Sequence, residues 1–156
     1  MSMDPQDCLT RFEGHGIRFD YPGYWELSVE SDGSDTILTV AADGTCFWSL
    51  RVLLECPRTD DVLKSCIDAF QEEYDDTEVL SANRTFAEMP AAVRELSFSC
   101  FELLNSAVLT CVRSSSMTLL CWWQGTDHEL EAVEPLFQQM TESVRIMALL
   151  PDEHRH

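Results

Sequence analysis

Alternation of apolar and polar residues predicts strands through the first third of the chain. Ile17, Phe19 and Tyr21 alternate with two charged residues, a period of two that is typical of a strand with one buried face. The same pattern predicts strands over 25–30, 36–42 and 46–55, separated by Gly- and Pro-containing turns. The segment 10–13, before the first of these strands, gives only a weak strand signal.

After Pro57 the period of the apolar residues changes from two to about 3.6, which predicts a helix over 60–76. Thr59 or Asp60 is expected to cap its N-terminus. One apolar stripe follows the helix and predicts its buried face: Val62, Leu63, Cys66, Ile67, Phe70 and Tyr74. The other face is acidic.

The second half of the chain repeats this order of elements. Strands are predicted over 78–84, 92–101, 107–113 and 117–124, with interruptions at 88–90 and at Asn105. The last strand is apolar on both faces, which is typical of a central strand that is covered on both sides. A short turn from Asp127 and a main helix from Val133 to Val144 follow, because Pro135 disfavours an unbroken helix.

The order ββββ-α-ββββ-α contains no βαβ alternation and no Gly-rich loop after a strand. It predicts an α+β fold in which a mainly antiparallel sheet of six to eight strands packs, sandwich-like, against two main helices. The length suits a single domain over 1–156, with its core at about 10–147 and flexible ends at 1–9 and 148–156. No apolar run is long enough to span a membrane.

Charge excludes several kinds of partner. The chain has 28 acidic and 10 basic residues, so its net charge is 10 − 28 = −18. Nucleic acid and anionic membranes both require a cationic surface, so neither is expected to bind. The predicted helix over 60–76 holds seven acids and one base, a net charge of 1 − 7 = −6, and is the most acidic part of the chain.

Nothing in the local sequence singles out a catalytic residue. The seven cysteines include no Cys-x-x-Cys pair, and we interpret them as reduced core thiols of a cytoplasmic protein; a disulfide between distant cysteines is the alternative. The spacing of Asp127, His128 and Glu131 would allow a metal, but it is more typical of an acidic helix start. We therefore predict no catalytic residue, no cofactor and no metal, and keep a Cys-dependent enzyme as the alternative class.

Acidic and aromatic residues provide the candidate partner surface. Because Trp122 and Trp123 point to opposite faces of one strand, we expect one to lie under a helix and the other near a groove. An acidic helix face is commonly only a solvated surface, but it also suits a basic protein partner. The candidate partner-binding residues are Asp68, Glu72, Asp75, Asp76 and Trp122.

Two segments resemble the PsbP-like superfamily. The run 17–25, Ile-Arg-Phe-Asp-Tyr-Pro-Gly-Tyr-Trp, resembles the opening strand of those domains, and 118–146 resembles their ending. The resemblance spans about 12–147. It implies an antiparallel sheet between helices and non-enzymatic binding to another protein, and it carries over no functional residue. The chain shows no secretion, lipoprotein or transit signal, which favours a cytoplasmic bacterial relative.

These observations favour a non-catalytic protein-binding or adaptor domain in the cytoplasm, with a basic protein as its partner. Two specific roles stay open within this class. One is a small acidic secretion chaperone, commonly a homodimer. The other is an immunity protein that covers the basic surface of a toxin.

Overall fold

A computed structural model describes residues 9–147 and confirms the α+β class. The elements are β1 (Leu9–Gly14), β2 (Ile17–Pro22), β3 (Glu26–Asp32), β4 (Asp35–Ala41), β5 (Phe47–Leu53), α1 (Thr59–Glu73), β6 (Glu78–Phe86), β7 (Met89–Cys100), β8 (Leu103–Arg113), β9 (Thr118–Thr126), α2 (Asp127–Ser143) and β10 (Arg145–Ile146). The predicted flexible ends, 1–9 and 148–156, lie outside the described residues, except for Leu9.

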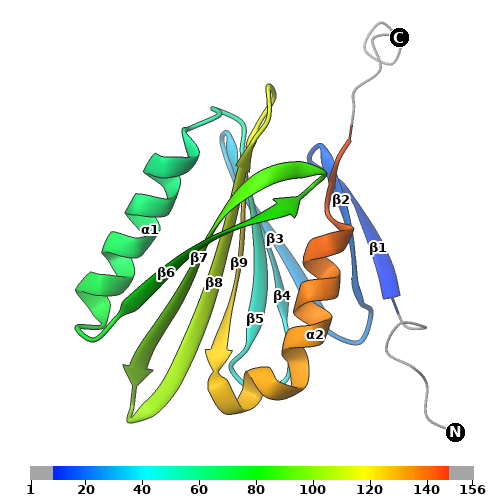
Figure 1. Cartoon of the computed structure of the whole chain (residues 1–156). Coiled ribbons are helices and arrows are strands. Elements are labelled where there is room, and N and C mark those ends of the chain that lie inside the picture. The colour runs from blue at the N-terminus through cyan, green and yellow to red at the C-terminus, as the bar shows by residue number, and fades with distance from the viewer. Residues whose placement is uncertain (1–8, 148–156) are drawn as a thin grey trace, which may run out of the picture.

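Two antiparallel sheets and two helices form the layers of the fold. Seven strands form the large sheet in the order β3-β4-β5-β9-β8-β7-β6, and β1, β2 and β10 form the small one. Figure 1 shows α1 on one face of the large sheet, and α2 with the small sheet on the other. The described residues thus hold ten strands where six to eight were predicted. The additions are β1, in the weakly patterned segment, and β10, whose two residues are too few to show a period.

The predicted central strand is confirmed as β9, the fourth of the seven strands. Leu119, Cys121 and Trp123 join the core beneath α2, and all three are buried. Leu120 and Trp122 pack in the core beneath α1. Because successive side chains of a strand point to opposite faces, one apolar run supplies both cores.

Helix α1 has the predicted buried stripe but different ends. Val62, Leu63 and Phe70 are buried as expected. The helix begins at Thr59, so the N-cap is Arg58, whose side chain makes no capping hydrogen bond; the predicted caps at Thr59 and Asp60 were wrong. It ends at Glu73, three residues before the predicted end. The acids beyond it belong to the loop that leads to β6.

Helix α2 is continuous from Asp127, which corrects the predicted turn over 127–132. Thr126 and Glu129 form a capping box, in which each side chain bonds the backbone N–H of the other residue, and this box starts the helix early. Pro135 is exposed and lies inside the helix. Figure 1 shows the first turns at an angle to the rest, the kink expected where proline removes a backbone donor.

Glu129 also joins α2 to the β4–β5 loop. Its carboxylate accepts hydrogen bonds from the backbone N–H and the hydroxyl of Thr45, at 2.8 and 2.5 Å. A Cβ at Gly44, where φ is +77°, would collide with this carboxylate, so the close approach requires glycine. Bonds from Thr45 and then Thr126 lower the pKa of Glu129 from 4.5 to about 2.

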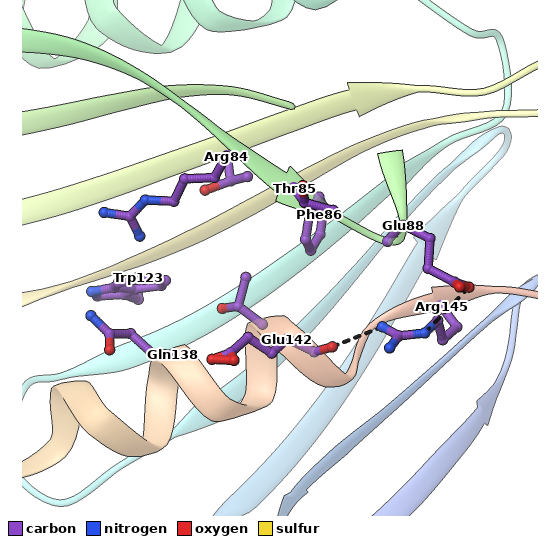
Figure 2. A pocket seen from close by; sticks show the side chains of 11 residues that line it. Arg84, Thr85, Phe86, Glu88, Trp123, Gln138, Glu142 and Arg145 are labelled. Atoms are coloured by element: carbon purple, nitrogen blue, oxygen red, sulfur yellow. Dashed lines mark hydrogen bonds and ion pairs between the residues drawn. The ribbon is translucent and has the colours of Figure 1, made fainter. Parts of the chain in front are cut away.

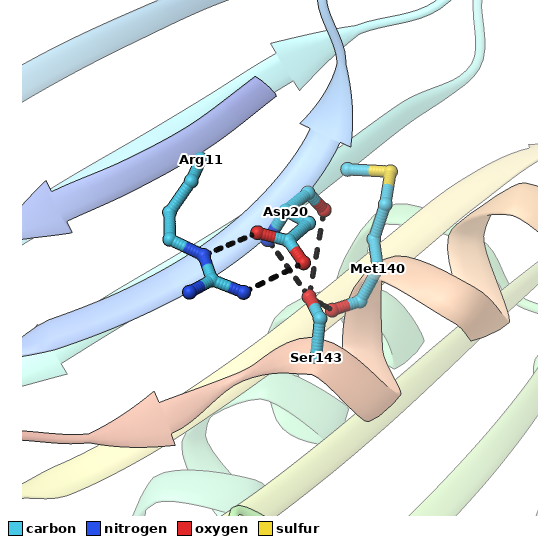
Figure 3. Close-up of polar contacts among 4 residues, drawn as sticks. All are labelled: Arg11, Asp20, Met140 and Ser143. Carbon is cyan, nitrogen blue, oxygen red and sulfur yellow. Dashed lines mark hydrogen bonds and ion pairs between the residues drawn. The ribbon is translucent and has the colours of Figure 1, made fainter. Parts of the chain in front are cut away.

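Ser143, at the end of α2, joins the helix to the small sheet. Figure 3 shows its hydroxyl between the two: it donates to the Met140 carbonyl and accepts from the Asp20 N–H at 2.8 Å. The Asp20 carboxylate accepts hydrogen bonds from the Nε and Nη2 of Arg11, at 2.9 and 3.3 Å. The part-buried bond between Ser143 and Asp20 links the end of α2 to β2, and the exposed ion pair adds little to stability.

The lowered pKa of Glu129 predicts how the fold responds to acid. A carboxyl whose pKa is depressed by folding stabilises the native state above its unfolded value of 4.5. That contribution is lost as the pH falls from 4.5 towards 2. We expect Glu129→Gln to lower the free energy of unfolding by about 1 kcal/mol at pH 7. We also expect the variant to lose less stability than the wild type over the acidic range, as measured by urea denaturation.

The exposed Glu131 provides the matched control for this measurement, because it lies two residues further along the same helix. Glu131→Gln should follow the wild-type curve. If Glu129→Gln and the wild type lost stability in parallel on acidification, the assigned role of Glu129 would be wrong.

Candidate functional site

The turn between β7 and β8 carries the most exposed large apolar side chain among the described residues. Phe101 is 93% exposed, and Leu103 and Leu104 are 56% and 57% exposed. Both β6 and β9 stop short of this turn, so the hairpin tip, residues 99–104, projects beyond its neighbours (Figure 1). Isolated exposed apolar residues are ordinary, but a projecting group of three makes the hairpin tip a candidate interaction site.

The backbone of the hairpin tip is strained. Phe101 and Glu102 have φ values of +53° and +65°, the left-handed conformation of a type I′ turn. Such turns strongly prefer Asn-Gly, and a bulky residue at positive φ is an outlier. The sequence prediction was therefore wrong here, because it continued one strand through Phe101 and placed the interruption at Asn105. In the structure Asn105 lies inside β8.

The acidic end of α1 lies beside the hairpin tip. Both carboxylate oxygens of Asp76 accept from the backbone N–H of Ser99 at 3.1 Å. Hydrogen bonding from the side chain and backbone of Ser99 lowers the pKa of Asp76 below its ordinary value. The Tyr74 ring stacks on Phe98, with 4.3 Å between their centroids. We call four exposed residues the acidic end of α1: Glu72, Glu73, Asp75 and Asp76.

Three of the four predicted partner-binding acids, Glu72, Asp75 and Asp76, thus lie at the acidic end of α1. The fourth, Asp68, lies one helical turn earlier. Asp68 is exposed and pairs with Lys64 across one helical turn at 2.8 Å, which partly neutralises it. Glu72 and Asp75 form no ion pair within the described part of the chain. The last turn of α1 contains no base, so its acids oppose the helix dipole.

Trp122 lies beneath α1 and is half-buried. Its ring meets Phe70 and Phe47 edge to face, with centroids 5.7 and 5.5 Å away, and its indole N–H donates to Gln124 at 2.9 Å. A shallow cavity of about 280 Å³ exposes the rest of the ring beside Tyr74. Trp122 is therefore mainly a core residue that borders the surface beside Glu73 and Tyr74.

Trp123 is buried against α2 and lines a larger cavity of about 630 Å³. Figure 2 shows its indole beside Gln138, with Arg84 on the opposite wall. The indole N–H has no hydrogen-bond partner among the described residues. Both tryptophans thus lie under helices, and each borders a cavity, so the predicted division between them was wrong.

The arginines of this cavity already have carboxylate partners. Arg84 pairs with Glu95 and Arg145 with Glu88, each at 3.4 Å, and Arg145 also donates to the Glu142 carbonyl at 2.7 Å. Their positive charges are therefore partly compensated. The remaining buried donor is an indole N–H, which suits a neutral acceptor such as a carbonyl rather than a free anion.

The six described cysteines are free thiols. Burial raises the pKa of Cys111 and Cys121 to about 12, and burial together with the nearby Glu129 does the same for Cys46. Burial also raises the pKa of Cys66. A nucleophilic cysteine needs the opposite shift, because the thiolate is the reactive form.

Within residues 9–147, no group of three His, Cys, Asp or Glu side chains is placed to hold a metal ion. Neither helix in that range is long and apolar enough to cross a bilayer.

Three solved structures resemble the chain over most of its length. Cyanobacterial PsbP (CyanoP) from Synechocystis sp. PCC 6803 has a TM-score of 0.64 at 13% identity, covering 89% of this chain and 92% of its own. LpqN, involved in cell envelope biogenesis of Mycobacterium tuberculosis, has a TM-score of 0.52 at 16% identity, covering 90% and 91%. PA94 of Pseudomonas aeruginosa, a protein of unknown function, has a TM-score of 0.50 at 13% identity, covering 92% and 96%.

The chain therefore has the PsbP-like fold, as the resemblance predicted. No family model and no curated protein matches it in sequence. At these identities the structural likeness defines the fold alone.

The strained hairpin tip predicts a substitution that stabilises the protein. Replacing Phe101 by Asn and Glu102 by Gly should raise the free energy of unfolding by about 1–2 kcal/mol, because both new residues accept positive φ. Urea denaturation followed by circular dichroism measures the change. A lower stability in this double variant would contradict the assignment of strain to the turn.

Proposed function

We propose that this chain is a non-catalytic protein-binding domain. Its partner surface would be the hairpin tip together with the acidic end of α1. The observation that carries the proposal is that a nearly fully exposed phenylalanine projects, on a strained turn, beside a cluster of exposed acids. Interface hot spots commonly combine an apolar anchor with a polar rim in this way.

The chemistry of this surface describes the partner that it would bind. Exposed phenylalanine and leucine side chains gain free energy when a partner covers them. The neighbouring acids attract positive charge and raise the association rate. The partner would therefore present basic residues around an apolar contact, as a basic amphipathic segment does.

Both specific roles remain proposals within this class. A chaperone that masks an apolar segment would depend mainly on the hairpin tip. An immunity protein that covers a basic toxin surface would depend mainly on the acids. A cytoplasmic location is part of the proposal, supported by several buried free thiols that an oxidising compartment would put at risk.

The alternative of a Cys-dependent enzyme has weaker support. The four cysteines with resolved shifts have raised pKa values, which disfavours the reactive thiolate. If this interpretation is right, iodoacetamide should label Cys111 and Cys121 only as fast as the protein unfolds, as mass spectrometry can measure. Rapid labelling of either residue in the folded protein would revive the enzyme hypothesis.

Removal of the apolar anchor should abolish capture of the partner. We expect Phe101→Asn, which keeps the turn, to weaken binding by at least about tenfold, the loss typical of an anchor residue. The tagged chain is used to isolate its partner from the native organism, and calorimetry then compares the wild type and the variant. Tyr24→Asn is the matched control, because Tyr24 is an aromatic 57% exposed at a distant turn. Equal binding by wild type and Phe101→Asn would refute the proposed surface.

The acids should contribute mainly through long-range attraction. Glu72→Lys should weaken binding and flatten its salt dependence, whereas Glu26→Lys, on the distant strand β3, makes the same change in net charge and should do neither. Glu72→Lys should also stabilise the free protein by roughly 0.3–1 kcal/mol, because a cation favours the end of a helix. A stabilised variant with unchanged affinity would show that the acids only solvate the surface.

A further inference from the structure

Strand β6 is an edge strand with few of the features that prevent edge-to-edge pairing. It pairs only with β7, and over nine residues it contains no proline and no lysine. Its outer side therefore presents unpaired backbone N–H and C=O groups. The opposite edge, β3, differs because it carries Glu26, Glu30 and Asp32, which would repel a second copy of the same strand.

We propose that β6 pairs with β6 of a second copy of this chain, antiparallel and about a two-fold axis at Ser81. In this register Glu78 faces the partner's Arg84, and Leu80 faces the partner's Ala82. The symmetry generates each pair twice, as in any isologous interface. The two large sheets would then form one continuous sheet.

Charge complementarity within β6 selects this register. Glu78 and Arg84 are the two charged residues of the strand, and both are exposed. Pairing about Ser81 places each of them opposite its counter-charge in the other copy. Their charges sum to zero in a chain of net charge −18, so the paired strands themselves add no net charge repulsion between two copies.

The pairing also covers an exposed apolar residue. Leu80 is 69% exposed on the face of the sheet that carries α2. Because directly opposed residues of antiparallel strands share a face, Leu80 and the partner's Ala82 would pack together between the two ion pairs. Arg84 can reach its new partner, since its contact with Glu95 is long at 3.4 Å and both side chains are about half exposed.

This interface adjoins the proposed partner surface, because Asp76 comes two residues before Glu78, but it uses other residues and responds to salt in the opposite direction. Two copies of net charge −18 repel at long range, so screening should strengthen the dimer as ionic strength rises from about 0.02 to 0.15 M. Attraction of a basic partner to the acidic end of α1 should weaken over the same range. The two proposals can therefore fail independently.

Charge reversal tests the interface. Sedimentation equilibrium should show a dimer for the wild type, and Glu78→Arg or Arg84→Glu alone should raise its dissociation constant about 100-fold, because each creates two like-charge pairs. The variant with both reversals should restore the dimer. Glu26→Arg, on the other edge, makes the same change in net charge as Glu78→Arg and should leave the dimer intact. Circular dichroism checks that each variant is folded.

A cysteine at the two-fold axis tests the register. Ser81→Cys should form an intermolecular disulfide on mild oxidation, because directly opposed Cβ atoms lie about 4.5–5.5 Å apart. Asn83→Cys is the control: it lies two residues along the same face of the strand and faces the partner's Val79. It should form no more intermolecular disulfide than the wild type. A monomer at every concentration, a dimer unaffected by both single reversals, or a folded double variant that stays monomeric would each overturn the proposal.

Discussion

The structure depends on the burial of β9 on both faces. A strand with Trp122 and Leu120 on one side and Trp123 and Cys121 on the other must be covered twice. That requirement places α1 and α2 on opposite faces of the sheet and leaves the small sheet to complete the layer of α2 (Figure 1). The position of α1 over β8 and β9 then determines where its acidic end meets the neighbouring hairpin.

Unfavourable local features gather at this meeting point. The last turn of α1 carries acids and no base, the hairpin turns through two residues at positive φ without glycine, and Phe101 remains exposed. Each of these features costs stability, and together they depart from the local consistency found elsewhere in the fold. Such departures are expected where a surface is selected for binding.

Residue patterns predicted most of the fold because burial imposes periods of two and 3.6. The α1 stripe and the two-sided β9 follow directly from those periods. The boundaries were less predictable, because they depend on tertiary contacts: Glu129 starts α2 early by bonding Thr126 and also holding Thr45, which lies 84 residues away. The acids of the candidate surface could be predicted from charge. The hairpin tip could not, because Phe-Glu carries no turn signal and Phe101 looks like the end of an apolar strand.

A comparison of the two turns that flank β7 shows that the fold does not impose the exposed phenylalanine. Ala87 and Glu88 have φ values of +52° and +65°, nearly the same as Phe101 and Glu102. Yet Ala87 is small and only 8% exposed, and Glu88 pairs with Arg145. The same backbone conformation thus holds a small, buried Ala87 at one end of β7 and a large, exposed Phe101 at the other. Neither the turn nor the core requires an aromatic residue at position 101, and the proposed contact with a partner would supply a reason for it.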